Sequence, residues 1–484
     1  MDLVQIAVDW HALAPELVLT GAACLVLVAD LFVPDRMKWV AMPLSAAGIV
    51  ATLVAVLTLA GDERVTLAGS FHVDSFSLFF KGVLCVIGLV VLALSFHYFR
   101  NGFYQGEYYF LMLCSLLGGV VMASSRDLVS IFIAIELISV PAFVMTGLRK
   151  RDVKSNEAAL KFFLFGVLST AVMLYGMSLI YGVTGTTLLP EIAGRLSGGA
   201  DAPIVVLGVF FVVVGFAFKI SAVPFHFWAP DTYEGAPSPV AAFLSTVSKI
   251  GGFVGLIILM FGAFPQVADA WRPLFAVLAT LTMTVGNLIA LRQRHIIRLL
   301  AYSGIAQSGY VLVAFALVDP GNIEATRAAF QAALIYLAIY GVMDVGAFAA
   351  AVAFARRGGT YFISDYAGLW HRSPAMALML AGFLVSLAGA PPMAGLWAKV
   401  FILLATIEAE VYWLAIVVGV NAVIAAWYYL AVVKRMFFDA PETREPIEVP
   451  LLLRGAMGVT VIALVVACVY PGVITELVER STPF

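Results

Sequence analysis

The sequence has few charged residues. Only 12% of its 484 residues are Asp, Glu, Lys or Arg, whereas 62% are hydrophobic, and the mean hydropathy is +1.01. Soluble domains carry about a quarter charged residues, so this chain lacks the surface that a soluble domain needs. It also lacks a basic excess, since the formal net charge is −2, and no basic stripe could neutralise phosphates. The composition therefore excludes a soluble fold and a nucleic-acid partner.

Cysteine is scarce, and motifs for metal or cofactor binding are missing. Iron–sulfur and zinc sites need clustered ligands, whereas each cysteine here stands alone in an apolar stretch and is interpreted as a small buried side chain. The sequence also lacks HExxH, a P-loop, and GxGxxG after a predicted strand. We therefore expect neither a cofactor nor a metal ion bound to this chain. The four cysteines are Cys24, Cys85, Cys114 and Cys468.

Long apolar runs are abundant. A membrane-spanning helix needs about 20 mostly apolar residues, and fourteen stretches meet this condition. The connecting segments are too short to hold a soluble domain, so the predicted fold is an all-α integral membrane protein with one membrane domain over 1–484. The predicted spans are 14–33, 39–60, 75–97, 108–125, 127–147, 156–182, 203–225, 239–263, 273–292, 296–317, 325–355, 374–406, 410–433 and 451–472.

Lysine and arginine alternate between the connecting segments. Odd-numbered segments carry 17 of these residues and even-numbered segments carry five. Because basic loops stay in the cytoplasm, this asymmetry predicts that both termini lie on the outer side of the membrane.

Prolines interrupt the seventh and twelfth spans, near Pro224 and near Pro391-Pro392. Broken backbone at membrane depth survives only where protein or a water-filled cavity satisfies it. The breaks are five spans apart, and five is odd, so the second unit would run upside down relative to the first, as in transporters with inverted repeats. We predict two inverted five-helix repeats over 108–263 and 271–438, flanked by three helices in 1–107 and the fourteenth helix in 439–484.

Five ionisable residues lie far from the ends of their spans. They are Glu136, Lys219, Lys249, Asp344 and Lys399. Lys249 is about ten residues into its span, which at 1.5 Å per residue places it about 15 Å deep. Each such charge costs at least about 2.5–3.5 kcal/mol. A static ion pair between helices would explain one of them, and for Asp344 this alternative stays open. Three lysines, a carboxylate and two adjacent breaks favour a path for ions.

Other polar residues could extend such a path. His226 follows the first proline, Ser245 and Ser248 precede Lys249, and Tyr302 lies in the tenth span. Each is a candidate for ordering water into a proton wire, although small hydroxyl residues also serve as packing contacts between membrane helices. Lys81 lies only about seven residues inside the third span, and we expect it to extend outward to the membrane surface.

Four sequence stretches resemble one family. They are the run from Lys219 to Val240, the run from Ser386 to Lys399, Arg298-Leu-Leu-Ala-Tyr-Ser303, and Ile135-Glu136-Leu-Ile-Ser. These stretches resemble the antiporter-like, proton-pumping subunits of respiratory complex I over roughly residues 105–435. The wording Tyr233-Glu-Gly-Ala-Pro237 and the lysine at 399 are similar to the N type (chain 2) of these subunits and differ from the M and L types.

The resemblance implies roles for matching residues. Glu136 and Lys219 would form an ion pair, Lys249 would be the central proton carrier, and Lys399 would be the terminal lysine on the exit side. The chain would act as a translocase subunit of NADH:quinone oxidoreductase in the bacterial plasma membrane, driven by quinone reduction elsewhere in the complex. NADH, FMN, iron–sulfur clusters and quinone would be held by partner subunits. The partners implied are the M and L subunits, the small membrane subunits and the lipid bilayer.

Two other functions stay open. The chain could belong to an Mrp-type multisubunit sodium/proton antiporter, or it could be a structural membrane scaffold. Sodium coordination favours several oxygen ligands, whereas this midline offers lysines, which repel cations. A scaffold would leave the buried lysines unexplained.

Overall fold

The computed structural model describes residues 8–100, 104–196, 203–358, 360–441, 445–447 and 449–482. Among these residues, twelve helical runs are long and apolar enough to cross a membrane. These are α1 (Ala14–Phe32), η1 with α2 (Asp35–Val40, Ala41–Thr58), α3 (Ser75–Phe99), α4 (Gln105–Ser124), α5 (Leu128–Thr146), α6 (Val153–Thr184), the run Ser238–Ala263, η5 with α12 (Pro265–Val267, Ala268–Ala290), α13 (Ile296–Ala316), α14 (Ile323–Gly358), α18 (Tyr412–Phe438) and α19 (Leu451–Val469).

Two shorter apolar helices complete the predicted number of spans. These are α8 (Pro203–Lys219) and α16 (Pro374–Ala388). Each is followed by a break in the helix, after which come α9 (Trp228–Gly235) and α17 (Ala394–Glu408). All fourteen predicted spans are therefore present as helices within a few residues of the expected bounds. The seventh and twelfth are interrupted where the breaks were predicted.

Polar residues set the ends of several spans. Asp74 begins α3 with a reciprocal capping box to Ser77, and Asp127 accepts hydrogen bonds from the first backbone N–H groups of α5. Such caps satisfy donors that a helix start leaves free. Gly185, with φ of 65°, ends α6 in the left-handed conformation that glycine adopts without a steric penalty.

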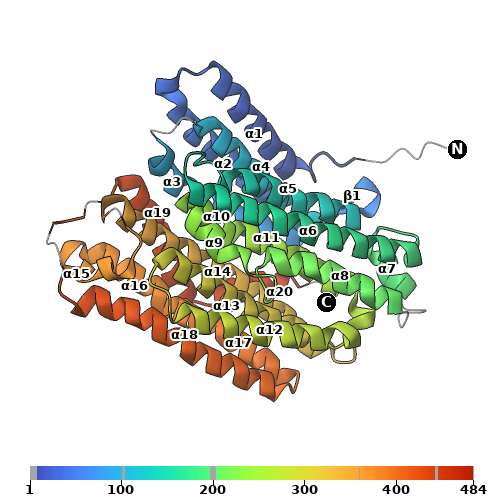
Figure 1. Ribbon diagram of the computed structural model, residues 1–484. Coiled ribbons are helices and arrows are strands. Elements are labelled where there is room, and N and C mark those ends of the chain that lie inside the picture. The colour runs from blue at the N-terminus through green and yellow to red at the C-terminus, as the bar shows by residue number, and fades with distance from the viewer. Residues whose placement is uncertain are drawn as a thin grey trace.

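The helices pack side by side into one bundle (Figure 1). Its centre is formed by α13, α14 and the run Ser238–Ala263. In the most apolar stretch of each, 94%, 94% and 100% of the residues are buried, respectively. By contrast, α1, α2, α18 and α19 are only about one third buried and form the outside. Neighbour relations recur five spans apart, because α4 packs on α5 as α12 packs on α13, and α6 packs on α8 as α14 packs on α17.

The run Ser238–Ala263 is not a regular α-helix. It consists of α10 (Ser238–Phe243), the π-helical η3 (Leu244–Ser248), α11 (Lys249–Ile257) and the π-helical η4 (Ile258–Ala263). Short π-helical stretches inside α-helices are frequent at functional sites. Lys249 is the first residue after one of them.

Several small elements were not predicted. All of them lie outside the long apolar runs, where hydropathy gives no signal. They are the antiparallel hairpin of β1 (Arg64–Thr66) and β2 (Phe71–Val73), with Arg64 opposite Val73, and the short helices η2 (Leu67–Gly69), α7 (Leu189–Leu196), η6 (Ile363–Tyr366), α15 (Leu369–Arg372) and α20 (Gly472–Arg480).

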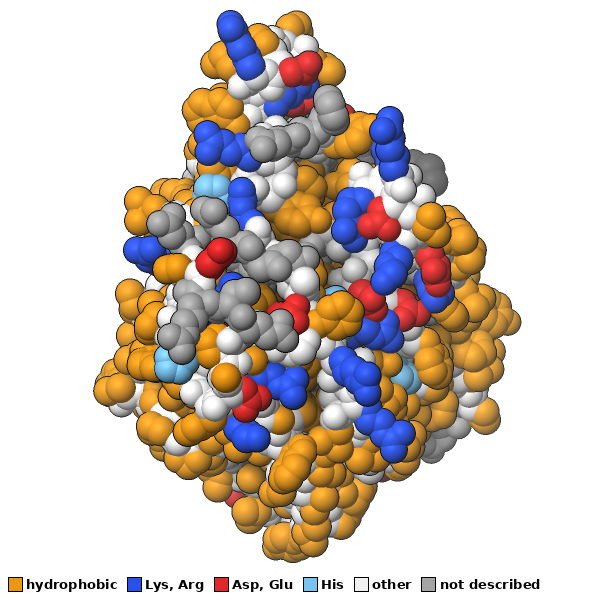
Figure 2. Space-filling model, turned by 60° about the vertical axis from the view of Figure 1, so that its left-hand side comes forward, with side chains coloured by type: hydrophobic (Ala, Val, Ile, Leu, Met, Phe, Trp, Pro, Cys, Tyr) orange, Lys and Arg blue, Asp and Glu red, His pale blue; other side chains and the backbone are white. Residues whose placement is uncertain are grey.

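Lysine and arginine side chains gather at one end of the bundle. Figure 2 shows this end, which lies at the left in Figure 1. We call it the basic end and define it by Arg149, Arg292, Arg294 and Arg435 of the odd-numbered connections. Hydrophobic side chains cover the lateral surface around it, as expected of a surface that faces lipid.

The prediction for Lys81 is wrong. Its side chain is fully buried, and its Nζ lies 2.7 Å from Oε1 of Glu16 on α1. Because α1 contributes this carboxylate on the inside of the bundle, Lys81 pairs inward and does not extend to the membrane surface. Glu16 stands only two residues into α1, and no sequence pattern indicated that these two residues would meet.

Candidate functional site

The first break, between α8 and α9, is held by partners from other helices. Ser308 of α13 donates a hydrogen bond to the carbonyl of Ile220 at 2.9 Å, and Thr282 of α12 accepts one from the N–H of Val223 at 3.0 Å. The indole of Trp228 donates to the carbonyl of Phe218 at 3.0 Å. Broken backbone inside a membrane needs such partners, so the break is built into the packing of the bundle.

Lys219 is the last residue of α8 and lies directly before this break. Its side chain is 1% exposed, and its Nζ donates a hydrogen bond to Oγ of Ser139 on α5 at 2.8 Å. Glu136 lies one turn before Ser139, where residues three apart share a helix face, and its buried Oε1 has no hydrogen-bond partner. Within the described residues, Glu136 and Lys219 thus make no direct ion pair, and Ser139 stands beside both.

Lys249 is completely buried at the start of α11, and no hydrogen bond satisfies its Nζ within the described residues. The amino group faces Gly304 of α13, because a Cβ atom added there would lie 3.0 Å from Lys249 Nζ. One turn further along α11, a Cβ added to Gly252 would lie 2.9 Å from Cγ of Lys219. The side chain of Lys219 therefore passes over the face of α11 that also carries Lys249.

Asp344 of α14 joins the surroundings of Lys249. It is fully buried, and Oδ2 accepts a hydrogen bond from the hydroxyl of Tyr340 at 3.4 Å. The same hydroxyl lies 2.8 Å from the carbonyl of Ser245 in η3, so that the two acceptors share its single proton. It also faces Gly304, where an added Cβ would lie 3.1 Å from it. Tyr340 thus connects a buried carboxylate to the helix turn directly before Lys249.

Lys399 lies across the second break. It is 4% exposed, and its Nζ donates hydrogen bonds to the carbonyls of Leu387 at 3.2 Å and Ala388 at 2.6 Å. These are the last carbonyls of α16, where a helix presents partial negative charge. Gly389 follows with φ of +80°, and a Cβ there would lie 2.7 Å from Cδ of Lys399. The lysine therefore caps the helix that the break ends.

Polar side chains of α13 connect the two halves of the bundle. Gln307 donates to the carbonyl of Leu387 at 3.0 Å and to the hydroxyl of Tyr429 at 3.3 Å. The hydroxyl of Tyr429 also bonds to Ser303, which precedes Gly304. Hydrogen-bonded groups therefore run from the residue beside Gly304 to the carbonyl that Lys399 holds.

The residues that link the lysines were not predicted from the sequence. They are Ser139, Tyr340, Gln307 and Tyr429. Each is a single polar side chain in a long apolar helix, which is the signal that could have suggested them. Such residues are common as packing contacts, so the sequence alone could not separate them from the others.

The remaining predicted path residues lie in different surroundings. His226 is buried inside the first break, and its Nδ1 has no hydrogen-bond partner among the described residues. Ser248 is buried at the end of η3, next to Lys249. Tyr302 is only partly buried. Within the described residues, the structure shows no hydrogen bond from its hydroxyl to Lys219, Lys249 or Lys399, which we call the lysine row.

A charge cluster anchors α9 at the basic end. Arg298 of α13 lies 2.8 Å from both Asp231 and Glu234, and Lys161 of α6 lies 2.8 Å from Asp231. Partial burial alone would raise the pKa of Asp231, but the hydrogen bonds from Lys161 and Arg298 outweigh it and hold this pKa below its usual value. Asp231 is therefore ionised at neutral pH and joins α9 to α6 and α13.

Comparison with known proteins agrees with this architecture. A family model described as NADH:quinone oxidoreductase/Mrp antiporter, TM, matches residues 125–425. Subunit N of NADH-quinone oxidoreductase from Moorella thermoacetica is 38% identical over 97% of this chain and 98% of its own length. Subunit N 2 from Streptomyces griseus is 43% identical over 90% of this chain and 85% of its own length.

Solved structures show the same fold. A chain of respiratory complex I from Thermus thermophilus with bound aureothin matches with a TM-score of 0.80 at 28% identity, covering 96% of this chain and 98% of that chain. A chain of the Mrp complex from Dietzia sp. matches with a TM-score of 0.85 at 20% identity, covering 98% of this chain and 96% of that chain, which shows the fold alone. The chain belongs to the NADH:quinone oxidoreductase/Mrp antiporter family of membrane proteins.

Proposed function

We propose that this chain is the N-type antiporter-like subunit of a NADH:quinone oxidoreductase and carries protons across the membrane. One observation carries the proposal: three lysines are buried along the same two helices. Lys219 lies against the face of α11 that carries Lys249, and polar side chains of α13 lead from beside Lys249 to the carbonyls that Lys399 binds. The relatives named subunit N, at 38% and 43% identity over nearly the whole chain, support the same assignment.

The two ends of the lysine row are held differently from its centre. Lys219 and Lys399 have oxygen acceptors, namely a serine hydroxyl and two backbone carbonyls, whereas the amino group of Lys249 has none among the described residues. A buried charged group needs a counter-charge or hydrogen-bond partners. A protonated Lys249 would therefore take its counter-charge from the carboxylate of Asp344, which is bonded to Tyr340 on the same side of Gly304.

The proposed coupling starts at Glu136. Its carboxylate stands one turn from Ser139, which holds Lys219. Quinone reduction elsewhere in the complex would move Glu136 toward or away from Lys219 through neighbouring subunits. An opposite charge within a few ångströms favours the charged lysine, so this movement would make Lys219 bind or release its proton. Lys219 would then pass its proton along the face of α11 to Lys249. From there the polar side chains of α13 would lead to Lys399.

The partners and cofactors follow from the same proposal. The chain would assemble with the M and L subunits and the small membrane subunits. NADH, FMN, iron–sulfur clusters and quinone would be held by other subunits of the complex. The breaks in the seventh and twelfth spans and the recurring helix neighbours support two inverted repeats, 108–263 and 271–438, with 1–107 and 439–484 outside them.

The test uses the assembled complex in sealed vesicles. We expect Lys249→Met and Lys219→Ala to remove the share of this subunit from the number of protons pumped per quinone reduced, while the complex stays assembled. Lys434→Ala, which removes an exposed lysine at the basic end, is the matched control and should pump normally. Normal pumping by the two relay variants in an intact complex would contradict the proposal.

The same vesicles separate a proton pump from a sodium/proton antiporter. We expect pumping to be unchanged when sodium is replaced by potassium. Ion exchange that needs sodium and proceeds without NADH would support the Mrp-type function instead.

A further inference from the structure

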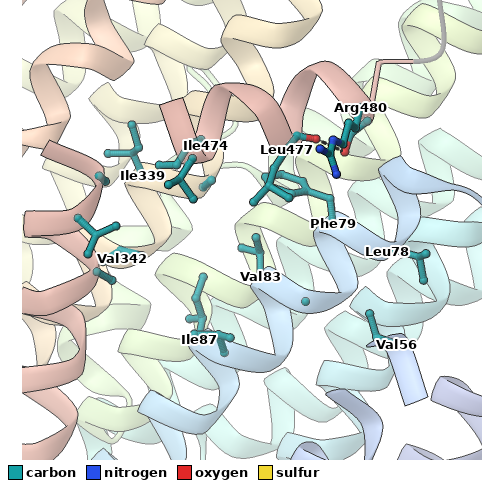
Figure 3. A pocket seen from close by; sticks show the side chains of 18 of the residues that line it. Val56, Leu78, Phe79, Val83, Ile87, Ile339, Val342, Ile474, Leu477 and Arg480 are labelled. Carbon is teal, nitrogen blue, oxygen red and sulfur yellow. Dashed lines mark hydrogen bonds between the residues drawn. The ribbon is translucent and has the colours of Figure 1, made fainter. Parts of the chain in front are cut away.

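An apolar hollow opens between α2, α3, α14, α19 and α20 at the end opposite to the basic end. Its volume is about 590 Å³. Figure 3 shows Val83 of α3, Val342 of α14 and Leu477 of α20 on its walls, with Arg480 at its outer end. The lysine row does not use this hollow, since none of the three lysines lines it.

The hollow is as deep as one leaflet of a bilayer. Along α3 its lining runs from Ser75 at the helix start to Ile87. Twelve residues at 1.5 Å each span about 18 Å, and half of a hydrocarbon core is about 15 Å. The depth ends where Ile87 packs on α14, because a Cβ added to Gly341 would lie only 2.4 Å from Cδ1 of Ile87. A transmembrane helix from a partner would need about 30 Å, so the hollow fits a half-membrane occupant.

The polarity of the lining changes from one end to the other. The shaft is apolar, whereas Ser75, Arg480 and Ser481 line its mouth and also line an adjoining pocket of about 290 Å³. Within the described residues, Arg480 makes no ion pair, although Arg64 beside the same pocket pairs with Asp9 and Asp62. An exposed arginine without a carboxylate partner at headgroup depth matches a phosphate, to which guanidinium groups bind bidentately.

Room for an acyl chain is built into α3. A Cβ atom added to Gly82, which lines the shaft, would meet nothing within 4 Å. We propose that the hollow binds one phospholipid of the leaflet opposite to the basic end, with an acyl chain in the shaft and its phosphate at Arg480. This inference does not rest on the proposed function.

The bound lipid would touch the second half of the bundle close to the lysine row. Val342 on its wall is two residues from Asp344, and Ala394 on its wall is the first residue of α17, which carries Lys399. The site therefore places a lipid chain against the two helices that hold these residues.

The experiment labels the assembled complex in vesicles that contain phosphatidylglycerol with a diazirine in its acyl chain. After illumination, we expect labelled peptides from α3, α14 and α20. Gly82→Leu should fill the shaft and lower this labelling at least fivefold. Gly419→Leu is the matched control, because Gly419 of α18 also has open space and lies outside the hollow. Leu477→Trp fills the shaft from the opposite wall and serves if Gly82→Leu does not assemble.

The headgroup is tested separately. Arg480→Gln should lower the labelling about threefold, whereas Glu479→Gln, on the next residue of α20, should not. Equal labelling in the filled variants and the control would overturn the proposal. Labelling confined to peptides of a partner subunit would also overturn it, because a partner helix would then cover the hollow.

Discussion

Single residues in this bundle are placed by what stands opposite them. Lys219, Lys249 and Lys399 are all buried lysines, yet one donates to a hydroxyl, one faces a glycine and one caps a helix end. The position of Lys249 also depends on Gly304, which has no side chain to occupy the space beside the amino group. This space lets Lys249 of α11 and Tyr340 of α14 approach the same point on α13.

This gives a prediction at the residue scale. A Cβ at Gly304 would lie 3.0 Å from Lys249 Nζ, which is closer than ordinary van der Waals contact, so the amino group must move. We expect Gly304→Ala to lower the number of protons pumped per quinone reduced, and Gly304→Val to lower it further, to the value of Lys249→Met, measured in vesicles with the intact complex. The control is Gly262→Val, where an added Cβ meets nothing within 4 Å. Equal pumping by the Gly304 and Gly262 variants would show that the site tolerates displacement of Lys249.

At the scale of elements, each of the two breaks interrupts a span and is hydrogen-bonded to other helices. The first break donates a hydrogen bond to α12 and accepts one from α13, and the end of α16 at the second break accepts hydrogen bonds from α13 and from Lys399. Because α13 is hydrogen-bonded to both breaks, a shift of this helix would change the hydrogen bonds at both. The short helix α9 after the first break is fixed separately, by ion pairs at the basic end.

The ion pairs of α9 give a prediction at the element scale. The hydrogen bonds that lower the pKa of Asp231 below its usual 3.8 stabilise the folded state fully above pH 3.8, and this stabilisation is lost as the pH falls through the lowered pKa. We expect Arg298→Gln to lower the thermal unfolding temperature at pH 7. The difference from the parent protein should begin to shrink as the pH falls below about 3.8, where Asp231 of the unfolded chain takes up its proton, and should go on shrinking down to the lowered pKa of the folded state. A difference that persists unchanged at pH 3 would assign the effect of Arg298 to packing.

The whole molecule is a membrane bundle with one strongly basic end. Its lateral surface is hydrophobic, and the charged side chains that it exposes gather at the ends of the helices, as Figure 2 shows for the basic end. The charge rule predicts that the basic end faces the cytoplasm. In a bacterial plasma membrane, α20 and the hollow beside it would then face outward.

Orientation is testable at this scale with a membrane-impermeant maleimide. Lys434 lies near the basic end and Glu479 near the opposite end, and both are exposed. We expect Lys434→Cys to be labelled only in inside-out vesicles and Glu479→Cys only in right-side-out vesicles or cells. The parent protein, with its four native cysteines, gives the background. The reverse pattern would show that the charge rule fails for this chain.

Much of the fold could be predicted because the membrane imposes simple conditions. A span must be apolar over about 20 residues, and a proline inside it removes a backbone hydrogen bond. The fourteen spans, and the breaks near Pro224 and near Pro391-Pro392, were therefore visible from order and composition, although α5 and α12 stay continuous around Pro141 and Pro273. The short elements outside the spans, such as α20 and the β1–β2 hairpin, were not, because no comparable condition acts on them.

The sequence by itself determined the class of protein, the number of spans and which residues are ionisable at membrane depth, since each follows from hydropathy and distance along a helix. Only the tertiary structure decided which of these residues meet. It paired Lys81 with Glu16, bonded Lys219 to Ser139, and brought Tyr340, which is bonded to Asp344, to the same point on α13 as Lys249. The physical reason is that partners come from helices far apart in the chain, and the side-chain contacts between such helices are set by packing and not by local pattern.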